Sequence, residues 1–358
     1  MMTKKWFSKV TTFVIGWFIS LFIWSMTRKY GIKSYLSVFD IEYSASNSFL
    51  YIALIAVICG ILFGSIQLLS EESIANKQRS FRNILIKGLG LHVFIMILIY
   101  LIIYIQLNLA IEKLEILFID FLTSPLILVN LGYSIVTNIF IVITIHLEKL
   151  LGKGNLLKLI TGRFYHPQEE ERVFMFIDLT SSTMIAEDLG HLQYSRFIQD
   201  CFLDLAVVEK YNAEVYQYVG DEAVLTWKMN KTVNTDACLL AFFAFSKRLQ
   251  DRTSYYQKNY GHVPFFKAGV HGGIITVVEI GSIKHEIAYH GDTINIASRV
   301  QEQCKKQGVS LLISKTIFDR IKNPTVFELI NTGNPLLKGK KNTTELYSVS
   351  LKNNTVLV

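Results

Sequence analysis

The chain reads Val-Phe-Met-Phe-Ile-Asp-Leu-Thr-Ser-Ser-Thr from Val173 to Thr183. The apolar start of this stretch, with its two aromatic residues, predicts a buried β-strand that ends at Asp178. The small hydroxyl residues that follow predict a helix start, where backbone N–H groups have no partner within the helix. A carboxylate beside such a helix start suits a metal-bound phosphate. Taken alone, a core strand followed by an ordinary Ser/Thr helix cap is the simpler interpretation.

The composition divides the chain into an apolar first half and a more polar second half. Its 358 residues have room for about two domains, and 51% of them are hydrophobic while only 18% are charged. The net charge of +7 is spread without a polybasic block, so nucleic acid is not an expected partner. The four cysteines have neither zinc-site nor CxxC spacing and are expected to be reduced thiols: Cys59, Cys201, Cys238 and Cys304.

The first half contains four long apolar segments, at about residues 10–26, 49–69, 90–109 and 126–145. Each approaches the ~20 residues that a helix needs to cross a bilayer. No small-residue cleavage site follows the first segment, which we therefore interpret as an anchor and not as a signal peptide. The sequence predicts a bundle of four transmembrane helices in contact with membrane lipid.

Basic residues predict the orientation of this bundle. Ten of them flank the side on which the chain begins: Lys4, Lys5, Lys9, Lys77, Arg79, Arg82, Lys87, Lys149, Lys153 and Lys158. Four flank the other side: Arg28, Lys29, Lys33 and Lys113. By the positive-inside rule the amino terminus and the second half are cytoplasmic, as in a multi-pass protein of the inner (plasma) membrane.

Four polar residues lie within the apolar segments: His92, Gln106, Asn130 and Asn138. Since none is an acid, a lysine or an arginine, hydrogen bonding between helices explains them better than a ligand site does. The segment 147–171 links the halves. It is either a helix lying on the bilayer or a coupling element that pairs two chains.

After residue 171 the pattern is that of a soluble α/β domain. We expect strands or helices over 172–178 (strand), 182–189 and 193–211 (helices), 214–219 and 223–227 (hairpin), 234–259 (helix), 265–270, 274–280 and 286–289 (strands) and 293–307 (helix). The order strand, helix, hairpin, helix, strand predicts a ferredoxin-like βαββαβ domain with its helices on one face. The expected domains are therefore 1–146, 147–171 and 172–358.

Three further motifs carry polar groups that could act together with Asp178 on a metal-bound phosphate. The turn of the predicted hairpin contains Asp221, which the βαββαβ order places near the end of the first strand, so the two carboxylates either share a proton or bind cations. Asn295 and Arg299 are four residues apart and share one helix face, where an amide and a guanidinium can hold sugar and phosphoryl oxygens. Lys338 lies in a Leu-Lys-Gly-Lys turn that is either a cationic contact for a triphosphate or simply basic.

These motifs, in this order and spacing, resemble the catalytic domain of class III nucleotidyl cyclases, and the first half resembles that of bacterial membrane-anchored members. The resemblance implies conversion of a nucleoside triphosphate to a 3′,5′-cyclic monophosphate and pyrophosphate with two Mg²⁺ per site, which Mn²⁺ can replace. It implies that Asp178, Asp221 and the Ile177 carbonyl bind metal, and that Asn295 and Arg299 are catalytic. It implies substrate contacts from Thr180, Ser181, Ser182, Thr183 and Lys338. It also implies a homodimer with two shared sites, because the aspartates and the Asn/Arg pair come from opposite subunits.

The two positions that select the base depart from the family. Adenylyl enzymes have Lys and Asp there and guanylyl enzymes tend to have Glu and Cys, whereas this chain has Gln217 and Ala288. An amide can both donate and accept and Ala288 offers no hydrogen bond, so the base stays open. ATP is expected first, with GTP or a pyrimidine nucleotide as alternatives. An alternative of another class is a catalytically silent receptor or binding module that uses the cyclase fold.

Overall fold

The computed structural model describes residues 2–27, 49–72, 81–110, 117–152, 154–229, 235–340 and 342–352. Contacts divide the chain into two compact units, Met1–Leu150 and Leu151–Val358.

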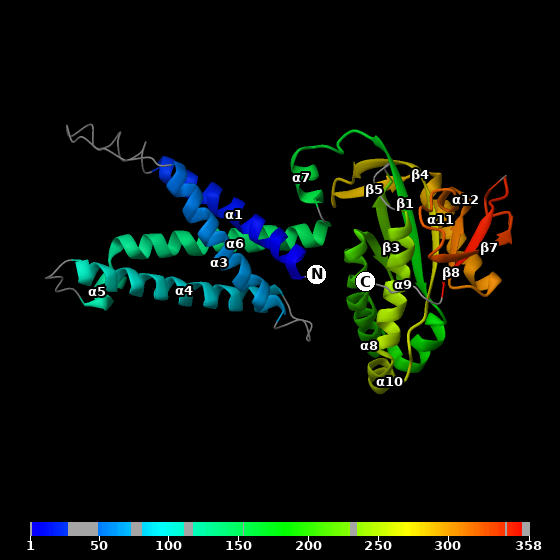
Figure 1. Ribbon diagram of the computed structural model, residues 1–358, viewed down its shortest axis with the longest axis horizontal. Coiled ribbons are helices and arrows are strands. Elements are labelled where there is room, and N and C mark those ends of the chain that lie inside the picture. Colours follow the sequence, from blue (N-terminus) through cyan, green and yellow to red (C-terminus); the bar gives the residue numbers. More distant parts are fainter. Residues whose placement is uncertain are drawn as a thin grey trace. The chain divides into compact units, whose positions relative to one another are not determined.

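The first unit is helical (Figure 1). Its helices are α1 (Met2–Thr27), α3 (Phe49–Glu72), α4 (Phe81–Ala110), α5 (Phe118–Leu122) and α6 (Pro125–Leu151). α1, α3, α4 and α6 share an apolar core in which Phe13 and Trp17 of α1 pack with Phe63 of α3 and Ile141 of α6. The short helix α5 has no counterpart in the prediction.

Three of the four predicted spans are confirmed by length and composition, over Trp6–Thr27, Phe81–Leu109 and Pro125–Leu151. The fourth, over 49–69, stays a prediction: α3 is a helix of 24 residues over Phe49–Glu72, and within the described residues its apolar run is Ile52–Leu68. Seven of the basic residues used for the orientation lie outside the described residues: Arg28, Lys29, Lys33, Lys77, Arg79, Lys113 and Lys153. The orientation therefore stays a prediction.

Two of the four polar membrane residues join helices, as predicted. The ring of His92 on α4 is hydrogen-bonded to Ser134 Oγ at 3.2 Å and to Asn138 Nδ2 at 3.2 Å, both on α6. Asn130 instead donates to the Leu126 carbonyl of its own helix, at 2.9 Å, and Gln106 is exposed. His92, Ser134 and Asn138 thus join α4 to α6.

The second unit contains a mixed β-sheet with helices. Its elements are α7 (Asn155–Ile160), β1 (Gln168–Leu179), α8 (Ser182–Asp204), a 3₁₀ segment (Leu205–Tyr211), β2 (Glu214–Val219), β3 (Glu222–Lys228), α9 (Asp236–Asp251), α10 (Thr253–Tyr260), β4 (Phe266–Ile280), β5 (Glu286–His290), α11 (Asp292–Gln307), β6 (Leu311–Ser314), α12 (Lys315–Phe318), β7 (Phe327–Gly333) and β8 (Leu346–Leu351). The strand order is β2-β3-β1-β4-β6-β8-β7, and β5 pairs with β4. Neighbouring strands are antiparallel except β4 and β6, which are parallel.

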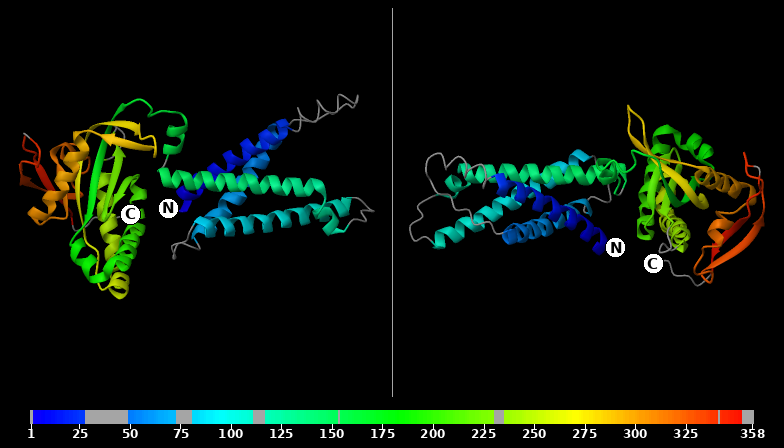
Figure 2. Two further views of the ribbon diagram at one scale, coloured as in Figure 1. Left: turned by 180° about the vertical axis from the view of Figure 1, so that it is seen from behind. Right: turned by 90° about the horizontal axis from the view of Figure 1, so that it is seen from above.

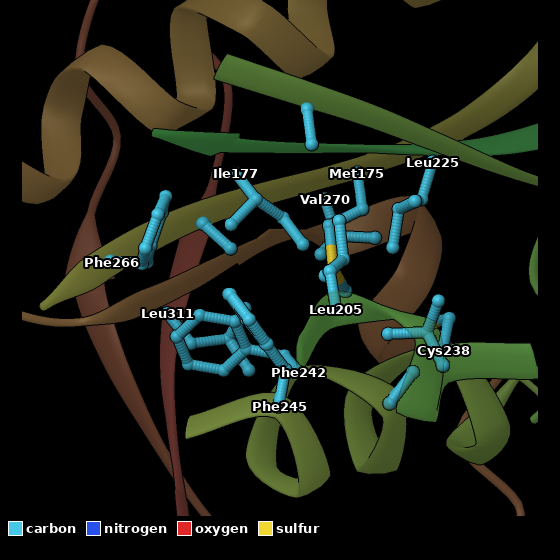
Figure 3. Close-up of a cluster of buried hydrophobic side chains, with 14 of the residues drawn as sticks. Met175, Ile177, Leu205, Leu225, Cys238, Phe242, Phe245, Phe266, Val270 and Leu311 are labelled. Carbon is cyan, nitrogen blue, oxygen red and sulfur yellow. The ribbon is translucent and has the colours of Figure 1, made fainter. Parts of the chain in front are cut away.

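Helices cover both faces of this sheet, which corrects the prediction of a single covered face (Figures 1 and 2). On one face Met175 and Ile177 of β1 pack against Phe197 of α8 and Phe242 of α9 (Figure 3). On the other face Phe174 and Phe176 of β1 pack with Tyr289 of β5 and Ala297 of α11. Since side chains alternate along a strand, Asp178 lies on the face that carries α11.

Two predicted helices and two predicted strands have different bounds in the structure. The helix expected over 193–211 gives way to a 3₁₀ segment after Asp204, and the helix expected over 234–259 breaks at Arg252 between α9 and α10. The buried carboxylate of Asp204 lies between the two breaks and accepts hydrogen bonds from Arg248, Arg252 and Tyr256. The strands expected over 265–270 and 274–280 form one long strand, β4.

The segment before β1 belongs structurally to the second unit. Phe164, which is 1% exposed, packs among Phe174, Ile275 and Tyr289. Its carbonyl accepts a hydrogen bond from the Glu279 N–H at 2.8 Å. The chain between α7 and β1 is therefore fastened to the sheet.

Candidate active site

The end of β1 and the turn between β2 and β3 form the acidic part of the site. In the ladder between β1 and β3, Asp178 is opposite Glu222, the residue after Asp221. Gly220 supplies the positive φ of 61° that the tight turn requires. Burial first, and then the negative charge of Asp221, raises the pKa of Asp178. The structure thus brings Asp178 and Asp221 together, as predicted.

Two further side chains in this acidic part were not predicted from the sequence. Burial, followed by the charges of Asp178, Asp221 and Glu302, raises the pKa of Glu222 to about 7. Burial, followed by the charge of Asp221, raises the pKa of Tyr194 on α8 to about 12. Glu222 directly follows Asp221, so the sequence motif could have revealed it. Tyr194 lies in a later turn of α8, and no sequence motif marks it.

The crowded carboxylates fit a divalent cation, because cations would offset both their burial and their mutual repulsion. Within the described parts of the chain, no group of three or more His, Cys, Asp or Glu side chains converges enough to hold a metal by itself. Mg²⁺ is commonly held by only one or two carboxylates, and water and substrate phosphates complete its coordination. Asp178 and Asp221 match that pattern. The Ile177 carbonyl as a third ligand stays a prediction.

The segment after Asp178 has an unusual backbone. Ser181 adopts φ 60° and ψ 31°, the left-handed region that residues other than glycine rarely occupy. α8 starts at the next residue, and its first turn has no side-chain cap. The Thr180 N–H donates to the Phe265 carbonyl at 2.8 Å, while the Thr180 hydroxyl is buried and has no hydrogen-bond partner among the described residues. Open N–H groups at Ser182 and Thr183 are available for an anion.

Helix α11 is held close to β4 by a glycine. A Cβ on Gly269 would lie 2.1 Å from the backbone nitrogen of Gln301, so only glycine permits this approach. Gln301 in turn donates from Nε2 to Asp178 Oδ2 at 3.4 Å. This contact between α11 and the end of β1 was also missed, because it depends on packing between segments far apart in the chain.

Asn295 and Arg299 lie on another side of α11. Successive helix residues are about 100° apart, so Arg299 is about 200° around the helix from Gln301. Asn295 is exposed, and the Arg299 guanidinium forms an ion pair with Glu302 of the same helix. In the described chain neither residue forms a hydrogen bond or ion pair with Asp178 or Asp221. In one chain Asn295 and Arg299 thus make no direct polar contact with the two aspartates, although the charge of Glu302, the partner of Arg299, acts on Glu222.

The two positions that were expected to select the base lie on strands that are not neighbours in the sheet. Gln217 is exposed on β2 opposite Val224, and Ala288 is buried on β5 opposite Val278. Their chain neighbours Tyr216 and Tyr289 are in ring contact, with centroids 4.6 Å apart. The structure thus brings the chain neighbours of the two positions together, although their strands do not pair.

Lys338 is exposed in the turn between β7 and β8. Lys340, two residues later, forms an ion pair with Asp292 at the start of α11. The basic turn therefore lies beside the helix that carries Asn295 and Arg299.

Known proteins resemble a large part of this chain. Adenylate cyclase 2 of Rhizobium meliloti (strain 1021) is 36% identical over 211 residues, which are 59% of this chain and 58% of the relative. Adenylate cyclase 1 of the same strain is 27% identical over 187 residues, which are 50% of this chain and 27% of the relative. The match thus spans less than two thirds of either relative.

A solved bacterial light-regulated adenylyl cyclase has the same fold with 19% identity and a TM-score of 0.53, over 64% of this chain and 67% of the other. The family model described as the adenylate and guanylate cyclase catalytic domain matches residues 164–350. That region contains both carboxylates, the Asn/Arg pair and the basic turn. The chain belongs to the adenylate and guanylate cyclase catalytic domain family.

Proposed function

We propose that this protein is a membrane-anchored nucleotidyl cyclase that converts ATP to 3′,5′-cyclic AMP and pyrophosphate. The observation that carries the proposal is the convergence of Asp178 and Asp221 at the end of β1, beside the uncapped start of α8. ATP is the proposed substrate because the relatives that match are named adenylate cyclases. The strand order β2-β3-β1-β4 supports a ferredoxin-like catalytic core.

The proposed assembly is a homodimer with two shared sites. Asp178 and Asp221 lie on one side of α11, and Asn295 and Arg299 on another. A second copy of the chain can supply the Asn/Arg pair to the carboxylates of the first copy. Each site would then combine the carboxylates of one protomer with the Asn/Arg pair of its partner.

The side chains have distinct roles in this scheme. Asp178 and Asp221, with the Ile177 carbonyl, would hold two Mg²⁺ or Mn²⁺ ions, which lower the pKa of the ribose 3′-hydroxyl and neutralise phosphate charge when bound. Asn295 orients the ribose so that its 3′-oxygen lies in line with the α-phosphorus. Arg299 donates to the α-phosphoryl oxygens as charge develops on them.

The remaining groups bind the two ends of the nucleotide. Within the segment Thr180–Thr183, the open N–H groups of Ser182 and Thr183 bind the β- and γ-phosphates. Lys338 adds a positive charge to the same end. Gln217 meets the edge of the base, and Ala288 leaves room without a hydrogen bond.

We propose residues 1–146 as the membrane anchor, 147–171 as the linker and 172–358 as the catalytic domain, with the end of the linker already packed against the sheet and forming the start of β1. The three apolar helices support an anchor in the cell's inner (plasma) membrane, and α3 is proposed as the fourth crossing. The basic residues favour a cytoplasmic amino terminus and catalytic domain.

The test is an assay of the full chain in membranes with ATP, GTP, CTP and UTP, each with Mg²⁺ or Mn²⁺. We expect cyclic AMP and pyrophosphate in equal amounts, with the other triphosphates converted more slowly. Faster conversion of GTP or of a pyrimidine nucleotide would replace ATP as the substrate. Binding of a triphosphate without turnover of any of the four would contradict the enzyme and favour a silent receptor.

A further inference from the structure

The turn between β7 and β8 is fastened to α11 at two points. Leu337, which is 1% exposed, packs with Val300 and Cys304 on the buried side of α11. The Lys340 N–H closes the turn by donating to the Leu337 carbonyl at 3.0 Å. The Lys340 ammonium forms the ion pair with Asp292 in the first turn of the helix. Lys338 lies between these two attachments.

The second attachment lies on the functional side of the helix. Asp292, Asn295 and Arg299 are spaced i, i+3 and i+7, so they form one stripe along α11. The ion pair with Asp292 therefore holds the basic turn on the side that bears the Asn/Arg pair. Asp178 contacts the other side, through Gln301.

The two lysines differ in what they contact. Lys340 is 20% exposed at its side chain, and its ammonium is engaged by Asp292. Its positive charge is also the second cause, after burial, that lowers the pKa of His271 to about 4. Lys338 is exposed and forms no ion pair within the described residues. Only Lys338 is thus available to a phosphate without first breaking an existing pair.

We infer that Lys340 and Asp292 are positioning residues that hold Lys338 beside Asn295 and Arg299, so that one chain presents the three as a single set to the triphosphate. This inference rests on the proposed function. It assigns to Lys340 no contact with substrate. The Asp292 side chain is 67% exposed, so water screens this ion pair and its contribution to stability is small. Its loss is expected to act through the placement of Lys338.

The test compares Lys340→Ala, Lys338→Ala and the double variant in the full chain. Lys340→Ala is expected to raise the KM for the triphosphate and the inhibition constant of pyrophosphate together, by about tenfold, while kcat changes little. Lys338→Ala should do at least as much. The double variant should be no worse than Lys338→Ala alone, because Lys340 acts only through Lys338.

Three controls separate positioning from general structure. Lys340→Arg and the charge exchange Asp292→Lys with Lys340→Asp should restore KM, since both keep an ion pair. Lys315→Ala, which removes another exposed lysine–carboxylate pair, with Glu345, should leave KM unchanged. Thermal unfolding should differ little between Lys340→Ala and Lys315→Ala.

Each outcome decides the inference. Additive effects of the two lysines would make Lys340 a direct phosphate contact and overturn it. A Lys340→Ala protein that behaves like Lys315→Ala, a charge exchange that fails to rescue, or a Lys338→Ala protein with unchanged KM would also overturn it. In all of these cases the wild-type chain still turns over triphosphate, so the proposed function stands. A wild-type chain without turnover would instead contradict the proposed function.

Discussion

Asp178→Asn is expected to lower the proposed cyclase activity by at least about 1000-fold, because losing the carboxylate proposed to bind metal would cost several kcal/mol of transition-state stabilisation. The amide has the shape of the carboxylate but lacks its charge. Asp221→Asn should have a similar effect, since the two carboxylates act on the same cations. The measurement is kcat/KM of the full chain with saturating Mg²⁺ or Mn²⁺.

A second readout distinguishes lost metal binding from misfolding. Burial and the charge of Asp221 raise the pKa of Asp178, so the charged form is disfavoured when no cation is present. Without added metal, Asp178→Asn should therefore unfold at the wild-type temperature or above it, and added Mn²⁺ should no longer stabilise it. Asp188→Asn, which changes an exposed carboxylate on α8 that faces His262, is the matched control. An Asp178→Asn protein with a tenth of the wild-type activity would rule out the assigned role.

Arg299→Ala is expected to lower kcat by about 100- to 1000-fold with a much smaller change in KM, since loss of one preorganised donor typically costs that much. The reason is that charge on the α-phosphoryl oxygens increases only as the reaction proceeds. Arg299→Lys should recover little, because an ammonium cannot replace the planar guanidinium fork. The measurement is a full kcat and KM determination for each variant.

Glu302→Gln serves as the companion variant for Arg299. It removes the carboxylate that pairs with Arg299 in the single chain, while the guanidinium remains. If Arg299→Ala raised KM and left kcat intact, Arg299 would bind ground state and transition state alike. That result would contradict a transition-state role.

The acidic part of the site was predictable because it depends on local patterns. The apolar run before Asp178 forms β1, and the Gly220-Asp221 turn lies between two strands whose bounds nearly match the prediction. Antiparallel pairing of β1 with β3 then leaves Asp221 no place other than beside Asp178. Strand period and turn chemistry sufficed for this step.

The surroundings of α11 were not predictable from local patterns. The contact between Gln301 and Asp178 exists because Gly269 lets a helix backbone approach a strand, which no spacing in the sequence reveals. The position of α11 on the second face of the sheet also depends on packing between segments far apart in the chain. The ion pair between Lys340 and Asp292 joins residues 48 positions apart, so local sequence patterns do not predict it either.

The sequence prediction misplaced two helix ends that lie near the buried carboxylate of Asp204. Asp204 draws Arg248, Arg252 and Tyr256 onto one carboxylate, which favours the breaks near residues 205 and 252 over continuous helices. The sequence pattern around these positions is still helical.

The central claim is that each site takes its carboxylates from one chain and its Asn/Arg pair from another. Its most direct test is coexpression of Asp178→Ala and Arg299→Ala chains in equal amounts, each variant being inactive alone. Random pairing makes about half of the dimers mixed, each with one intact site, so about a quarter of the wild-type specific activity should return. Activity in the mixture no higher than in either variant alone would contradict the shared site.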